Sequence, residues 1–141
     1  MTGSPQDPLS RPTVAIFNAS DDTVDMIGEL LTASGMRCVN GRFADLRKGT
    51  LDFVGFIAQH QPNVIIFDIN PPYDRNWNFF KILRETDSVK HRPIVLTTTN
   101  KASLDDAAGR DSGAREVIGK PYDMNQLLEA VRRALLQSSV R

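Results

Sequence analysis

The chain is 141 residues long, with 40% hydrophobic and 24% charged side chains, and its 17 basic and 17 acidic residues cancel to a formal net charge of zero. This length suits one domain with a substantial core and leaves too little chain for two ordinary domains. The balanced charge provides no bulk electrostatic attraction for nucleic acid or for a membrane surface. A lone cysteine, Cys38, excludes an internal disulfide framework and a cysteine-based metal cluster.

Neither a membrane span nor a secretory signal is visible in the sequence. The longest apolar runs, at 14–17 and 64–67, fall far short of the roughly 18 residues that a transmembrane helix needs. The N-terminus has no basic stretch followed by an apolar one. We therefore expect a cytoplasmic protein that binds neither nucleic acid nor a membrane.

In chain order, residues 1–12 are rich in proline and small polar residues, which offer too little apolar surface to offset the entropy of ordering. We expect a flexible arm over 1–12, one folded domain over 13–137 and a flexible end at 138–141. Within the domain, short continuous apolar runs are typical of strands buried on both faces. These runs lie at 14–17, 64–67 and 94–96, with weaker candidates at 36–39 and 115–118.

Helical patterns lie between the apolar runs, and Gly35 and Pro62 mark where two of them stop. The last pattern begins with Asp123 and has Gln126 three residues later, a variant of the capping box. The apolar stripes are Val24, Ile27, Leu30 and Leu31; Leu51, Val54 and Ile57; Trp77, Phe80 and Leu83; and Met124, Leu127, Leu128, Val131 and Leu135. Alternating strands and helices predict a doubly wound α/β domain with a five-stranded parallel sheet and right-handed crossovers.

Polar residues follow the apolar runs. Asn18 ends the first run, Asp68 and Asn70 follow the second, residues 97–99 are all threonine, and Lys120 follows the last run. The carboxyl ends of parallel strands meet at one edge of the sheet, where ligands bind in such domains. We therefore expect a carboxylate, hydroxyls and an ammonium to converge there and to stabilise an anion bound to, or formed on, Asp68.

Each of these residues also has a purely structural interpretation. Asp68 stands shortly before two prolines and can act as a turn-former that bonds loop amides. Threonines such as those at 97–99 favour strands by propensity, and a Lys-Pro pair is common in loops. Only the joint arrangement favours a functional site.

Three segments carry a resemblance to a known family: VIIFDINPP at 64–72, PIVLTT at 93–98 and KPY at 120–122. Over residues 12–137 the sequence resembles the receiver domain of two-component response regulators. The intervals from Asp68 to Thr98 and from Thr98 to Lys120 match the spacing of the family's Asp, Thr and Lys. The resemblance implies a flavodoxin-like fold with strand order 2-1-3-4-5.

The resemblance also implies a role for each matching residue. Asp68 would be the phosphoacceptor, whose carboxylate attacks a phosphoryl group in line and forms an acyl phosphate. Lys120 would pair with the phosphoryl oxygens, and Thr98 would donate a hydrogen bond to the phosphorylated form. Mg²⁺ would be held by Asp68 and by the backbone carbonyl of Asn70. Pro121, which completes the family's Lys-Pro pair, would belong with Thr98 to the switch.

The acidic pair that holds Mg²⁺ in the family is degenerate in this chain. Receivers usually end the first strand with two adjacent acidic residues, and here Asn18 and Ala19 stand at those places. Asp21 and Asp22 follow about one helical turn later, and Asp21 is a candidate compensating ligand. Mg²⁺ is normally held by one or two carboxylates, and Asn18 offers only a weak neutral ligand. We therefore expect weak Mg²⁺ binding and slow phosphorylation of Asp68.

Two further positions depart from the family pattern. Val117 occupies the place of an aromatic residue that moves inward in many receivers, so switching must use the backbone after Thr98 or another element. Arg75 and Asn76 replace the usual Asp-Gly after the acceptor loop.

The sequence leaves three functions open. The first is a single-domain response regulator, a signalling protein and not an enzyme, that is phosphorylated by a histidine kinase or phosphotransfer protein. No output domain follows Arg141, so we expect output by contact with an unknown downstream protein, and a homodimer is a further option. The second is a phosphorylation-independent interaction module, or pseudo-receiver. The third is a small aspartate-nucleophile phosphohydrolase resembling the haloacid-dehalogenase group, which Asn70 and the short chain disfavour.

Overall fold

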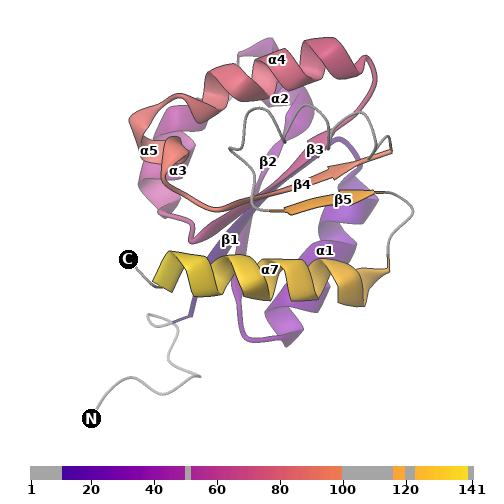
Figure 1. Cartoon of the computed structure of the whole chain (residues 1–141), viewed down its shortest axis with the longest axis vertical. Helices are drawn as coiled ribbons and strands as arrows, with labels where there is room; N and C mark the ends of the chain where they lie inside the picture. The colour runs from indigo at the N-terminus through magenta and orange to yellow at the C-terminus, as the bar shows by residue number, and fades with distance from the viewer. Residues whose placement is uncertain (1–10, 50–51, 100–115, 120–122, 140–141) are drawn as a thin grey trace.

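A five-stranded parallel sheet forms the centre of the molecule (Figure 1), and its strand order is β2-β1-β3-β4-β5. The computed structural model describes residues 11–49, 52–99, 116–119 and 123–139. The strands are β1 (Thr13–Asn18), β2 (Arg37–Arg42), β3 (Val64–Ile69), β4 (Ile94–Thr98) and β5 (Glu116–Gly119). The doubly wound fold and the strand order predicted from the sequence are confirmed.

Helices cover both faces of the sheet, with α1 and α7 on one face and α3, α4 and α5 on the other (Figure 1). Their bounds are α1 (Asp21–Ala33), α2 (Phe43–Lys48), α3 (Phe53–His60), α4 (Tyr73–Arg84), α5 (Asp87–Lys90) and α7 (Met124–Ser139). None of the helices within the described residues has the length and apolar character that a membrane span requires.

The core divides into two clusters because the side chains of a strand alternate between the two faces of a sheet. On the α1 and α7 face, Val64 and Ile66 of β3 pack with Ile27 of α1. On the opposite face, Phe67 lies between the rings of Phe17 and Phe80, at centroid distances of 6.0 and 5.2 Å. Strands buried on both faces account for the continuous apolar runs in the sequence.

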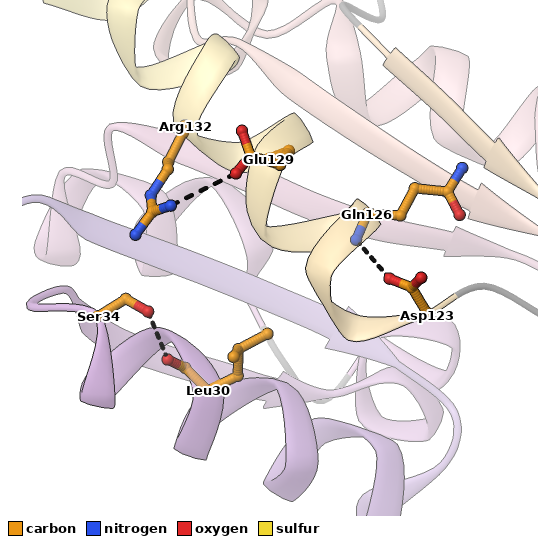
Figure 2. A network of polar contacts seen from close by, with 6 residues as sticks. All are labelled: Leu30, Ser34, Asp123, Gln126, Glu129 and Arg132. Carbon is orange, nitrogen blue, oxygen red and sulfur yellow. Dashed lines mark hydrogen bonds and ion pairs between the residues drawn. The ribbon is translucent and has the colours of Figure 1, made fainter.

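Side-chain caps fix the ends of the two helices on the first face. The predicted cap of α7 is present, since the carboxylate of Asp123 accepts a hydrogen bond of 2.7 Å from the backbone N–H of Gln126 (Figure 2). At the start of α1, Ser20 Oγ accepts from the N–H of Thr23, and at its end the Ser34 hydroxyl donates to the Leu30 carbonyl. Such caps satisfy backbone groups that a helix leaves unpaired at its ends.

The predicted apolar stripe of α3 is wrong in one member. The sequence pattern placed Val54 with Ile57 on the buried face, but Val54 is exposed, and Phe53 and Ile57 are the buried residues of this helix. A spacing of four residues aligns side chains on one helical face as well as a spacing of three does, so the sequence period was ambiguous. Leu51 lies outside the described residues. The short helices α2 and α5 were not predicted from the sequence.

Replacement of Ile27 by Ala tests the core. Ile27 is inaccessible to solvent, whereas its neighbour Met26 on the same helix is 53% exposed. We expect Ile27→Ala to lower the free energy of unfolding by about 2–5 kcal/mol, because apolar contacts are lost and a cavity remains. Met26→Ala should change it by less than about 0.5 kcal/mol, as is usual for surface positions. Urea unfolding of both variants measures the difference, and equal effects would contradict the assignment of α1's buried face.

Cys38 allows a second test of the packing. Its side chain is half-buried on β2 and packs against the α1 and α7 cluster. Burial raises the pKa of the Cys38 thiol above its ordinary value, and a hydrogen bond with Thr32 offsets part of that rise. Because the thiolate is the reactive form, alkylation by iodoacetamide near pH 8 should be slower in the folded protein than in urea. Equal rates in the two states would contradict this packing.

Candidate functional site

Asp68 is a fully buried carboxylate at the carboxyl end of the central strand β3, with only Ile69 after it in the strand. The pairing of β3 with β4 sets Asp68 opposite Thr97, which is also fully buried. The Thr97 hydroxyl donates a hydrogen bond of 2.5 Å to Asp68 Oδ1. Because a buried carboxylate is stable only with compensating partners, this bond fixes the orientation of the Asp68 side chain.

The other residues of the predicted phosphoryl site differ in how far the structure describes them. Thr98 is the last residue of β4, is fully buried and pairs with Ile69. Val117 lies in β5 opposite Leu96, which fixes its backbone beside β4. Lys120 and Pro121 lie outside the described residues. The predicted roles of Thr98, Val117, Lys120 and Pro121 therefore stay predictions.

Asn18 occupies the end of β1, beside Asp68. Since Phe17 is paired with Phe67, the next residues along these two parallel strands are Asn18 and Asp68. The Asn18 side chain is only 4% exposed. Its Oδ1 accepts a hydrogen bond of 2.8 Å from the backbone N–H of Ser20, and its Nδ2 has no partner within the part of the chain that the structure describes. A buried N–H donor therefore stands at this edge of the sheet.

The acidic residues nearest to Asn18 in the sequence belong to helix α1. Ala19 is exposed and has no polar side-chain atom. Asp21 and Asp22 are exposed in the first turn of α1, where negative charge is favourable near the helix N-terminus. The helix N-terminus accounts for both carboxylates, and the role of Asp21 as a compensating ligand stays a prediction.

Two side-chain contacts tie the loop after β3 to its surroundings. Asn76, which is 3% exposed within α4, donates through Nδ2 to the backbone carbonyl of Asn70 at 2.6 Å. The hydroxyl of Tyr73 is hydrogen-bonded to the hydroxyl of Thr99, just beyond β4. The loop also holds a cis peptide bond between Pro71 and Pro72. These contacts join the start of α4 to the ends of β3 and β4.

These residues fit Mg²⁺ poorly. A protein site for Mg²⁺ normally offers one or two carboxylates and oxygens that keep the ion's octahedral geometry. Here the Asn18 oxygen and the Asn70 carbonyl each already accept a hydrogen bond, and Ala19 offers no ligand. Within the described residues, no group of three or more His, Cys, Asp or Glu side chains is placed to hold a metal ion. We therefore derive no chemical step through the metal.

The fold and this edge of the sheet define a class of protein: a doubly wound α/β domain with a buried acidic residue at the carboxyl end of its central strand. The family that the comparisons identify is the response regulator receiver domain, which matches residues 14–132. The chain belongs to this family, whose members act in two-component signalling.

Curated relatives agree with this assignment. The polar-differentiation response regulator DivK of Brucella anthropi is 23% identical over 123 residues, which is 87% of this chain and 95% of DivK. Its Brucella ovis counterpart is 22% identical over the same shares of the two chains.

Solved structures show the same fold. Chemotaxis protein CheY4 of Vibrio cholerae aligns with a TM-score of 0.70 at 24% identity, covering 89% of this chain and 99% of CheY4. The receiver domain of Francisella response regulator 1452 aligns with a TM-score of 0.71 at 19% identity, covering 91% and 99%.

Family membership settles the coarse function. Receiver domains are signalling modules that interact with kinases or phosphotransfer proteins and with downstream proteins, which points to a signalling protein and not to an enzyme. The family generally depends on Mg²⁺, so the poor fit of the residues around Asp68 is a property of this chain's site.

Sequence reasoning missed two residues that contact the site. Thr97 was one of three threonines expected near Asp68, but the resemblance gave the specific role to Thr98, whereas alternation along β4 places Thr97 with Val95 on the face that also bears Asp68 and Ile66. Asn76 was noted only as a departure from the family pattern. It lies four residues before Phe80, so a polar residue on the buried stripe of α4 was the available signal.

The bond between Thr97 and Asp68 can be measured with a double-mutant cycle. We expect Thr97→Val to destabilise the protein by about 1.5–3 kcal/mol at neutral pH, because a hydrogen bond to a buried charged group is lost. In an Asp68→Ala background the same substitution should have little effect, and this difference is the coupling energy of the pair. Thr99→Val, which removes a hydroxyl that bonds Tyr73 and not Asp68, is the matched control and should show no coupling to Asp68. Urea unfolding gives all values, and a coupling energy near zero would contradict the hydrogen bond.

Proposed function

We propose that this chain is a single-domain receiver that accepts a phosphoryl group on Asp68 and signals by contact with another protein. The observation that carries the proposal is the buried Asp68 carboxylate at the carboxyl edge of the sheet, oriented through Oδ1 by Thr97. A fixed nucleophile close to its attack geometry lowers the entropic part of the barrier to phosphoryl transfer.

In the proposed reaction, Asp68 Oδ2 attacks the phosphorus of a phosphohistidine on the donor protein. The new O–P bond forms as the P–N bond breaks, and the leaving imidazole takes up a proton from solvent. The product is an acyl phosphate on Asp68. Thr97 holds Oδ1 on the side of β4, and Oδ2 is the proposed attacking atom. Thr98 and Lys120 are the proposed ligands of the phosphoryl oxygens.

The proposed partners follow from this chemistry. A histidine kinase or a phosphotransfer protein supplies the phosphoryl group, and an unidentified downstream protein, or a second copy of the chain, reads the modified surface. We place these events in the cytoplasm. We expect the reaction to be slow, because Asn18 and Ala19 stand where receivers usually have an acidic pair.

A second function has its own supporting observation. The oxygens of Asn18 and Asn70 already accept hydrogen bonds from the chain, so the site offers few ligands for the metal on which the family depends. This arrangement favours a phosphorylation-independent receiver that signals by protein contact alone. The third function predicted from the sequence, a phosphohydrolase, has no such support.

Incubation with acetyl phosphate over a range of Mg²⁺ concentrations distinguishes the two functions. We expect the intact mass to increase slowly by one phosphoryl group in the wild-type chain. The increase should disappear in Asp68→Asn, which removes the nucleophile, and should persist in Asp22→Asn, which makes the same chemical change at an exposed carboxylate.

Each other outcome has a definite meaning. Absence of the adduct at every Mg²⁺ concentration would favour the phosphorylation-independent function. An adduct that survives in Asp68→Asn would show that Asp68 is not the acceptor. Turnover of phosphate esters would support the phosphohydrolase function.

A further inference from the structure

The sheet edge beside Asp68 presents a hydrogen-bond donor at a place where a cation would need an oxygen. Asn18 Oδ1 accepts from the Ser20 N–H, and only the oxygen of an amide can accept such a bond. The Asn18 –NH₂ group therefore points the other way, and it has no partner among the described residues. A buried donor without a partner is rare in proteins and calls for an explanation.

Alternation along β1 determines which face of the sheet bears the Asn18 side chain. Val14, Ile16 and Asn18 alternate onto the face of the sheet that also bears Val64, Ile66 and, at the next position, Asp68. The –NH₂ group carries partial positive charge beside the carboxylate edge. Such a group attracts the oxygens of an oxyanion and repels Mg²⁺.

Asn76 acts on the loop that follows Asp68. Its buried Nδ2 donates a short hydrogen bond of 2.6 Å to the Asn70 carbonyl. Pro72 supplies no side-chain cap at the start of α4, so this side chain is what links the helix to the carbonyl of the preceding loop. A cation that used the Asn70 carbonyl would have to compete with this bond.

The acidic residues near this edge support the same conclusion. Asp21 and Asp22 are exposed on the first turn of α1, and no group of three or more metal-ligating side chains exists among the described residues. With Asn18 and Ala19 in place of an acidic pair, the edge lacks the excess of negative oxygens that draws Mg²⁺ out of water.

We propose that the sheet edge beside Asp68 excludes Mg²⁺, and that the side-chain amides of Asn18 and Asn76 are the groups that exclude it. Asn18 places a donor where a ligand oxygen is required, and Asn76 engages the carbonyl of Asn70. This edge is thereby suited to an oxyanion, such as a phosphoryl group, bound by the chain's own donors. The proposal concerns the site of the proposed function, but its test measures cation binding and is decided whether or not Asp68 is phosphorylated.

A Mg²⁺ titration followed by isothermal titration calorimetry and by the fluorescence of Trp77 tests the proposal. Trp77 is the single tryptophan of the chain and directly follows Asn76 in α4. Wild-type protein should show no saturable Mg²⁺ binding at Asp68, so its titration should match that of Asp68→Asn. The combined variant Asn18→Asp, Ala19→Asp, Asn76→Ala should gain saturable binding, with a Kd at least about tenfold below the highest Mg²⁺ concentration at which the wild-type chain shows no response, because it adds two carboxylates and releases the Asn70 carbonyl.

Matched variants assign the effect to the named groups. Adding Asp68→Asn to the combined variant should abolish the gained binding. Replacing Asn76→Ala in that variant by Asn78→Ala, at an exposed asparagine of the same helix, should give weaker binding. Circular dichroism and urea unfolding establish that each variant is folded.

Two results would overturn the proposal. One is saturable Mg²⁺ binding by the wild-type chain that Asp68→Asn removes, and this titration remains decisive if the combined variant fails to fold. The other is a folded combined variant that binds Mg²⁺ no better than the wild-type chain. Neither result affects the acetyl phosphate experiment, which tests the proposed function independently.

Discussion

A carboxylate buried at the end of a parallel strand is the constraint on which the rest of this site depends. Asp68 is inaccessible to solvent, and a charge in that environment is costly unless hydrogen bonds compensate it. The Thr97 hydroxyl supplies one such bond, and it can do so because β3 and β4 pair with these two residues opposite each other. The register of the sheet therefore decides which threonine meets the carboxylate.

The two apolar clusters hold that register. The strands are buried on both faces, so a shift of β4 by one residue would move its whole apolar set to the wrong face. Side-chain contacts then attach the loops to this frame, through Asn76 on the Asn70 carbonyl and through Tyr73 on Thr99. The site thus stands on rigid elements, an arrangement that keeps polar groups in fixed geometry.

Membership in the receiver family establishes the fold and the signalling class, whereas the chemistry of this site depends on its own side chains. Solved receivers share the fold at 24% identity or less in the comparisons described above. Near Asp68, Asn18 and Ala19 stand where receivers usually have two carboxylates. The departure is concentrated at the ends of β1 and β3, while the apolar strands keep the pattern of the fold.

The sequence by itself determined the architecture, because apolar runs, helical stripes and the Asp123 cap are local patterns that the structure reproduces. It also predicted that polar residues at the strand ends, Asp68 among them, lie at one edge of the sheet, since the ends of the apolar runs are visible in the sequence. Only the tertiary structure decided that Thr97 bonds Asp68, that Val54 is exposed, and that Asn76 reaches the Asn70 carbonyl. These facts depend on strand register and helix rotation, which arise from packing between segments distant in the chain and leave no local trace in the sequence.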